Sequence, residues 1–220
     1  MTPVRLVFVV VIVAALSAGL AAIVVFPASS GSSGPEPELP AGGVELERLG
    51  ETPDWTLTAS TGERVSSADL RGTPYIVDFI FTRCKVACPL MTAHMREIQE
   101  MLAGSDMLGN VKLVSVSVDP EHDRPDVLAE FKAGYGAHPR HWLFLTGDSR
   151  EKVWRLVEDG YLLGVAEDPD NEAMPIDHST RFGLVDANGV IRGYYDSDDP
   201  EDRRRITADA IALAKAAGLP

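Results

Sequence analysis

The pattern of hydrophobic and polar positions predicts that strands and helices alternate along most of the chain. Residues 75–81 (YIVDFIF) are nearly all apolar, which is typical of a strand covered on both faces. Pro89 suits the first turn of the helix that follows, and Gly104 suits its end. Between them, apolar side chains recur at helical spacing and form one inward-facing stripe of Met91, Met95, Ile98 and Leu102.

The same alternation continues to the C-terminus. Further strands are predicted at residues 111–118 and 142–146, and a hairpin-like stretch precedes them near residues 55–65. Residues 180–186 and 190–195 flank Asn188-Gly189, a strong signal for a β-hairpin. The remaining helices are expected to start at Asp123-Pro125, at Asp148 with Glu151 as a capping box, and at Asp199-Pro200. This order predicts an α/β fold with a mainly parallel sheet, a C-terminal hairpin, and helices on both faces.

The N-terminus has a different composition and is predicted to lie outside this domain. Residues 6–26 carry no charge, and about 20 helical residues suffice to span a bilayer. We expect residues 1–26 to form a membrane anchor or a signal, with Arg5 on the cytoplasmic side and the rest of the chain outside. Residues 27–43 are rich in Pro, Gly and Ser and are typical of a flexible linker, which leaves 44–220 as the folded domain.

Charge and cysteine content narrow the function. The net charge of −13, from 20 Lys and Arg against 33 Asp and Glu, argues against nucleic-acid binding, which needs a basic surface. The chain has two cysteines, Cys84 and Cys88, at the junction between the first long strand and its helix. In an exported, oxidising compartment such a pair forms a disulfide, is re-reduced, or binds a metal.

The position of the two thiols favours thiolate chemistry. A helix N-terminus stabilises negative charge, and Arg83 and Lys85 add cations, so we expect the thiol pKa values to be lowered. Thiolates attack disulfides and also bind metals, so this feature does not separate the two chemistries. A purely structural disulfide would close a very small loop and contribute little stability.

A third ligand is needed if the site binds Cu(II) or Zn(II), whereas two thiolates alone suit Cu(I). His178, directly before a predicted strand, is the natural candidate, because the topology places its loop beside the cysteines. His94 lies inside the cysteine helix and ranks lower, and His122, His138 and His141 lie in polar loops. Residues 167–177 are acidic and are predicted to form a solvated loop.

Three segments resemble the SCO/SenC family of copper-binding, thioredoxin-like proteins: FTRCKVACP, VSVDPEHDRP and DHSTRFGLVDANG. The resemblance implies a thioredoxin-like fold, a membrane anchor, and copper ligands at Cys84, Cys88 and His178. It gives Asp119 a supporting role near the metal loop. It also implies copper delivery to cytochrome c oxidase. The chain departs from the family at Lys85 and Val86, where a proline and an acidic residue are common.

Two functions therefore remain open. The first is a copper chaperone that loads the copper-accepting subunit of cytochrome c oxidase or another exported copper protein. The second is a thiol–disulfide oxidoreductase that uses Cys84 and Cys88. Asp78 favours the second, because it precedes Cys84 by six residues, as does a proton-relaying buried aspartate in thioredoxins.

Overall fold

The computed structural model describes residues 46–220. The expected anchor at 1–26 and the linker at 27–43 with its junction lie outside the described part, so both stay predictions. No helix in residues 46–220 is long and apolar enough to cross a membrane.

An eight-stranded sheet forms the centre of the described domain, with the strand order β1-β10-β9-β4-β5-β6-β2-β3. Its strands are β1 (Gly50–Glu51), β2 (Thr56–Ala59), β3 (Arg64–Ser66), β4 (Tyr75–Ile80), β5 (Lys112–Ser117), β6 (Trp142–Thr146), β9 (Arg181–Val185) and β10 (Val190–Asp196). Strand β4, which leads to the cysteines, lies in the middle and is buried along its whole length.

The prediction of a mainly parallel sheet is wrong, because parallel pairing is confined to the central strands. β4, β5 and β6 run parallel to one another. β9 is antiparallel to β4, β10 to β9, and β2 to β6. The two strand–helix–strand crossovers give the parallel core, whereas hairpins add antiparallel strands on both sides.

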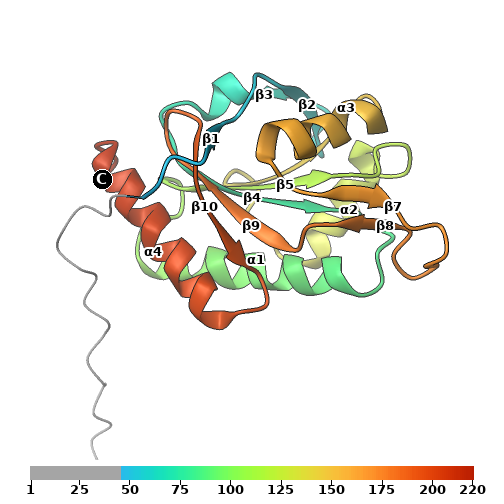
Figure 1. Ribbon diagram of the computed structural model, residues 1–220. Coiled ribbons are helices and arrows are strands. Elements are labelled where there is room, and N and C mark those ends of the chain that lie inside the picture. Colours follow the sequence, from blue (N-terminus) through green and yellow to red (C-terminus); the bar gives the residue numbers. More distant parts are fainter. Residues whose placement is uncertain (1–45) are drawn as a thin grey trace, which may run out of the picture. The chain divides into compact units, whose positions relative to one another are not determined.

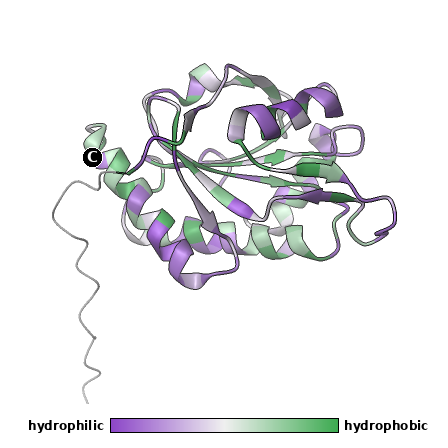
Figure 2. Ribbon diagram, viewed as in Figure 1, coloured by the Kyte–Doolittle hydropathy of each residue, from purple (hydrophilic) through white to green (hydrophobic). Residues whose placement is uncertain are grey.

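The helices cover both faces of the sheet, as predicted. They are α1 (Ala87–Gly104), α2 (Pro125–Gly134), α3 (Arg150–Arg155) and α4 (Pro200–Ala216), with a short 3₁₀ helix at Ser67–Leu70 and a π-helical turn at Leu156–Gly160. Helices α1 and α4 lie together on one face, and α3 lies on the other (Figure 1). Figure 2 shows that the central strands are largely hydrophobic, whereas α3 and α4 carry many hydrophilic residues. The apolar stripe predicted for α1 is confirmed as core: Met91, Met95, Ile98 and Leu102 are at most 1% exposed.

Two helix starts differ from the sequence-based prediction. Ser149, rather than Asp148, caps α3 by accepting a hydrogen bond from the Lys152 N–H. Asp148 instead pairs with Arg64. The N-cap of α2 is Arg124 rather than Asp123. The predicted hairpin at Asn188-Gly189 is confirmed, and Gly189 has a φ of +78°, a conformation that favours glycine.

A second, two-stranded sheet lies within the segment predicted to be a loop. It is an antiparallel ribbon of β7 (Val165–Glu167) and β8 (Ile176–His178), which we call the β7–β8 ribbon. The ribbon lies beside the start of α1 (Figure 1). It therefore brings His178 to the end of the sheet at which the cysteines lie.

Candidate metal centre

Cys84 and Cys88 are free thiols in the loop from β4 into α1 and in the first turn of that helix. Cys84 is 4% exposed and Cys88 is fully buried. The Cys84 N–H donates to the Phe81 carbonyl in a tight turn, at 3.3 Å, and this turn directs the loop back toward the helix. The loop therefore presents the Cys84 sulfur to the start of α1.

The sulfur of Cys84 occupies the place of a helix cap. The N-cap residue, Val86, makes no side-chain cap, and the Cys88 N–H donates to Cys84 Sγ at 3.4 Å. The Cys88 thiol and the N–H groups of Cys88, Val86 and Ala87 stabilise the thiolate and lower the pKa of Cys84 to about 5, although burial opposes them. The hydrogen bond between the Cys84 and Cys88 thiols, together with burial, raises the pKa of Cys88. The two thiols therefore differ, whereas the sequence predicted that both pKa values would fall.

Arg83 was expected to lower the thiol pKa values, but its guanidinium lies elsewhere. It binds Asp119 through Nε at 2.9 Å and Nη2 at 2.5 Å. The stabilisation of the Cys84 thiolate comes from hydrogen bonds at the helix start instead.

His178, at the end of β8, lies against the cysteine helix as predicted. Its Nε2 is 3.2 Å from Cys88 Sγ, and its imidazole is 6% exposed. The Nδ1 lies 3.1 Å from the Ser179 carbonyl, which can only accept, so Nδ1 carries the proton and Nε2 keeps its lone pair. The Phe81 ring packs edge-on against the imidazole, with 5.6 Å between ring centres. Burial lowers the pKa of His178, so the imidazole is neutral at physiological pH and able to bind a metal.

The donor atoms of Cys84, Cys88 and His178 are of the right kind for copper, but they do not form one closed set. In residues 46–220, the group of three His, Cys, Asp or Glu side chains whose ligand atoms lie within 4.8 Å of one another is Asp119, His122 and Asp123. The sulfur and nitrogen donors are more widely spaced than that. Because Cys88 Sγ and His178 Nε2 already lie 3.2 Å apart, binding one ion would require Cys84 Sγ to move toward this pair.

The carboxylates of the group formed by Asp119, His122 and Asp123 already accept hydrogen bonds within the protein. Asp119 is buried and binds Arg83 and Arg150. A metal ion there would have to displace both arginines. Asp119 thus supports the site indirectly, because Arg83 directly precedes Cys84.

Asp123 is a residue that sequence reasoning missed, because it was taken as a helix start. Its buried carboxylate accepts from the Thr82 N–H at 2.9 Å, the Thr82 hydroxyl at 2.5 Å and the Ser117 hydroxyl at 2.6 Å. His122 Nδ1 lies 2.9 Å from Oδ1 of the same carboxylate. Asp123 therefore anchors the residue two positions before Cys84.

Asp78 lies in the middle of β4, is fully buried, and is paired in register with Ser115 of β5. Neither carboxyl oxygen has a hydrogen-bond partner within residues 46–220. Burial raises the pKa of Asp78 to about 7. Its charge acts on Cys88, because an ionised Asp78 contributes to the raised pKa of that thiol.

His94, His138 and His141 have partners other than the thiols. His94 packs beside Asp198, with 3.7 Å between Nδ1 and the carboxylate. His138 and His141 stack on each other with 4.3 Å between ring centres, and His141 lies 3.1 Å from Lys112 Nζ. The prediction that placed His178 first is therefore consistent with the packing.

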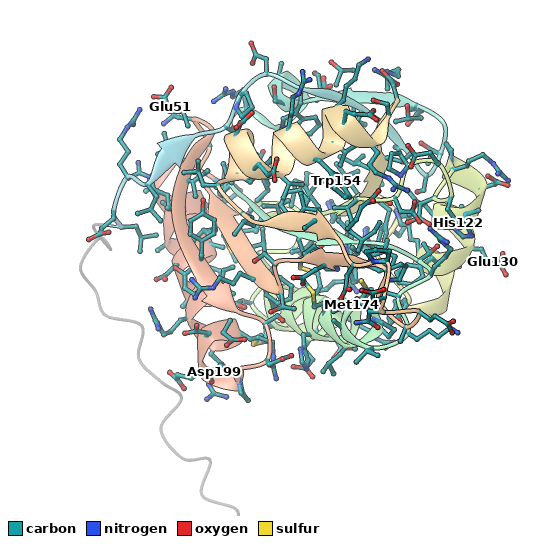
Figure 3. All side chains as sticks on the ribbon, turned by 45° about the vertical axis from the view of Figure 1, so that its right-hand side comes forward. Glu51, His122, Glu130, Trp154, Met174 and Asp199 are labelled. Atoms are coloured by element: carbon teal, nitrogen blue, oxygen red, sulfur yellow. The ribbon has the colours of Figure 1, made fainter. Side chains whose placement is uncertain are left out.

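A backbone contact joins the cysteine loop to the far end of the ribbon's connection. The Lys85 N–H donates to the Ala173 carbonyl at 3.1 Å. Figure 3 shows Met174, next to this contact, in the half of the domain that also holds Trp154 and His122. Val86, between the two cysteines, and Leu90, two residues after Cys88, are 65% and 49% exposed, so the site is bordered by apolar surface.

Comparison with known sequences gives consistent relatives. The SCO1/SenC family model matches residues 45–215. The SCO1 protein homolog of Bacillus subtilis is 35% identical over 145 residues, which covers 66% of this chain and 73% of the relative.

Solved structures agree with these relatives. BsSco, a member of the Sco family of cytochrome c oxidase assembly proteins in which a disulfide switch is described, superposes with a TM-score of 0.69 and 30% identity, over 77% of this chain and 97% of that one. Arabidopsis thaliana ScoI with copper bound superposes with a TM-score of 0.61 and 25% identity, over 76% of this chain and 99% of that one. The α/β fold, the match over residues 45–215 and the identity to these relatives together establish that the chain belongs to the SCO1/SenC family.

Proposed function

We propose that the protein is a membrane-tethered copper chaperone that binds one copper ion through Cys84, Cys88 and His178. It would deliver the ion to the copper-accepting subunit of cytochrome c oxidase or to another exported copper protein. The observation that carries the proposal is the lone pair of His178 Nε2, which points at Cys88 Sγ from 3.2 Å. The copper-bound structure of the 25% identical ScoI supports the same cargo.

The donor set suits copper as cargo. Two thiolates favour Cu(I), and the imidazole adds the nitrogen that Cu(II) requires. The lowered pKa of Cys84 makes its thiolate available at neutral pH, whereas Cys88 releases its proton when it binds the ion. A partner's ligands would then replace these donors one at a time.

The tether and the location follow from the sequence. The uncharged run at residues 6–26 is long enough to span a membrane, and Arg5 favours a cytoplasmic N-terminus. We therefore propose that the domain lies on the extracytoplasmic side of the cell membrane.

The test is a copper titration of the full-length, reduced protein in detergent micelles, without oxygen and against a competing chelator. We expect one copper per chain and a sulfur-to-copper charge-transfer band in the Cu(II) form. Cys84→Ser should abolish the band, and His178→Ala should weaken binding by at least about tenfold while Cys84 still reacts with alkylating agents. The matched control is His138→Ala, which removes a histidine remote from the thiols and should bind copper like the wild type. Binding that is equally strong in His178→Ala would remove His178 from the site.

A second candidate function is supported by Asp78. A thiol–disulfide oxidoreductase needs one reactive thiolate, which attacks a partner's disulfide, and one thiol that is deprotonated later to release the reduced partner. Cys84 fits the first role, and Cys88 fits the second with Asp78 as the group that takes its proton. The products are the partner's two thiols and a Cys84–Cys88 disulfide. A complete lack of copper binding in the titration would make this the preferred function.

A further inference from the structure

The β7–β8 ribbon carries His178 but is not part of the main sheet. In residues 46–220, its strands pair with each other and with no strand of the eight-stranded sheet. Val165 and Ile176 anchor it in the core. Hydrogen bonds within the ribbon fix its shape but not its distance from the cysteine loop, so that distance depends on contacts made by its side chains and its connecting loop.

Arg150, in the first turn of α3, makes such a contact. Its guanidinium donates to three carboxylates at once: Nη1 to Glu167 at 2.9 Å, Nη2 to Asp119 at 3.2 Å, and Nε to Glu121 at 3.1 Å. Glu167 is the last residue of β7, whereas the other two belong to the connection from β5 to α2. Arg150 thus joins the ribbon to the main body of the domain.

The chain of contacts continues to the cysteines. The second oxygen of Asp119 binds Arg83, which directly precedes Cys84. The side chain of Asp119 is 1% exposed, so this link is shielded from water. One buried carboxylate therefore connects the arginine that holds the ribbon with the arginine of the cysteine loop.

The position of Arg150 is itself fixed. Its guanidinium lies over the Trp154 ring, 5.7 Å from the ring centre. Trp154 extends from α3 toward the sheet (Figure 3), where its indole N–H donates to the Val118 carbonyl at 2.9 Å. A planar guanidinium can donate hydrogen bonds to three carboxylates in fixed directions, whereas a lysine ammonium on a flexible stem cannot.

We propose that Arg150 is a positioning residue for His178: it holds the β7–β8 ribbon at a fixed distance from the cysteine loop through Glu167 and Asp119. The inference deepens the proposed function, and its copper readout rests on that function. Its first readout needs no metal. A failure of the proposed function can therefore be distinguished from a failure of this inference.

The first readout is amide hydrogen exchange in the metal-free, reduced, full-length protein. One amide reports on the distance between the ribbon and the cysteine loop: Lys85, which donates to the Ala173 carbonyl in the ribbon's connecting loop at 3.1 Å. In Arg150→Gln we expect this amide to exchange about fivefold faster, while amides of β4 and β5 keep their wild-type rates. Wild-type exchange at Lys85 would overturn the inference.

Two further variants make this result specific. Lys152→Gln is the matched control on the same helix, because it removes an exposed cation that pairs with Asp148 at 3.4 Å and should leave the ribbon unchanged. Glu167→Gln removes one exposed partner of Arg150 and cannot unfold the core. It should accelerate exchange of the same Lys85 amide, and no change would overturn the role of Glu167. Arg150→Lys should restore wild-type exchange only in part.

The second readout is copper affinity in a double-mutant cycle. Arg150→Gln should weaken copper binding about fivefold in the wild-type background and should have no effect when His178→Ala is already present. An equal loss in both backgrounds would show that Arg150 does not act through His178. If the wild-type protein binds no copper, the proposed function fails and the exchange rates alone decide the role of Arg150.

Discussion

Cys84 and Cys88 are four residues apart, yet they differ in acidity. Cys84 lies outside the first helical turn and accepts hydrogen bonds from N–H groups, whereas Cys88 lies within that turn and is fully buried. The difference in pKa arises from the hydrogen bond between the two thiols and from burial, and the charge of Asp78 adds to it. In both candidate functions Cys84 would therefore make the first bond, and Cys88 would follow once its proton has left.

Asp78 should make the stability of the domain depend on pH. Its pKa is raised from 3.8 to about 7, so between these values the folded state holds a proton that the unfolded state has lost. Stability contributed by the protonated form is thus complete at low pH and is lost as the pH rises through about 7. We expect Asp78→Asn to gain up to about 3 kcal/mol relative to the wild type between pH 5 and pH 8. Urea denaturation at both values measures this, and parallel changes in the two proteins would contradict it.

The same substitution separates the two candidate functions. If Asp78 takes the proton of Cys88, Asp78→Asn should slow reduction of a disulfide-bonded peptide by at least about tenfold, whereas copper binding should not weaken. A wild-type rate would leave Asp78 as a packing residue.

The sequence could single out Cys84, Cys88, His178 and Asp78 as candidates, because their residue types and spacing point to thiol or metal chemistry. It could not identify Arg150 or Asp123. Their partners lie 31 and 41 positions away, respectively, in Asp119 and Thr82. Which acidic residue meets which donor is decided by the packing of α3 and of the loop after β5, and local sequence patterns do not report it.

At the scale of elements, the loop between β4 and α1 is held by a neighbouring loop. Asp123→Ala would leave the Thr82 N–H and the Ser117 hydroxyl without their acceptor inside the domain. We expect a loss of about 2–4 kcal/mol in the free energy of unfolding. Chemical denaturation of the reduced protein measures this. Asp126→Ala is the matched control, because Asp126 is exposed and pairs with Arg124 at 3.4 Å. Equal losses in the two variants would contradict the anchoring role.

Elements with clear periodicity were predicted correctly, and short elements were not. The strand at β4 and the helix α1 follow the apolar pattern closely. The three-residue strands of the β7–β8 ribbon lie in an acidic segment with two prolines, where no alternation can be seen. Only their packing against the core makes them strands, so the element that carries His178 was predicted as a loop.

For the whole molecule, sequence order predicted the layers but not the direction of every strand. The helices cover both faces as expected, whereas β9 and β2 run antiparallel to the central strands. Strand direction at the edges depends on which neighbour each hairpin joins. That choice is made by the complete sheet and not by any single segment.

Apolar surface beside the thiols should matter for transfer to a partner. Leu90 is 49% exposed near the cysteines, and a docked partner could bury it. We expect Leu90→Ser to slow copper transfer to the acceptor domain of cytochrome c oxidase by about tenfold, with unchanged copper affinity. The matched control is Leu49→Ser, a leucine that is 39% exposed beside β1. Transfer that is equally fast in both variants would contradict a docking role for this surface.

The separate hydrogen bonding of the β7–β8 ribbon has a consequence for unloading. A protein that delivers a metal ion must release the ion as well as bind it. In the proposed function, the nitrogen donor is on a part of the chain that shares no strand pairing with the sulfur-bearing body in residues 46–220, so the ion's coordination would open on one side while the core stays intact. The lifetime of the loaded state would then vary independently of the stability of the fold, through substitutions in a few ribbon residues.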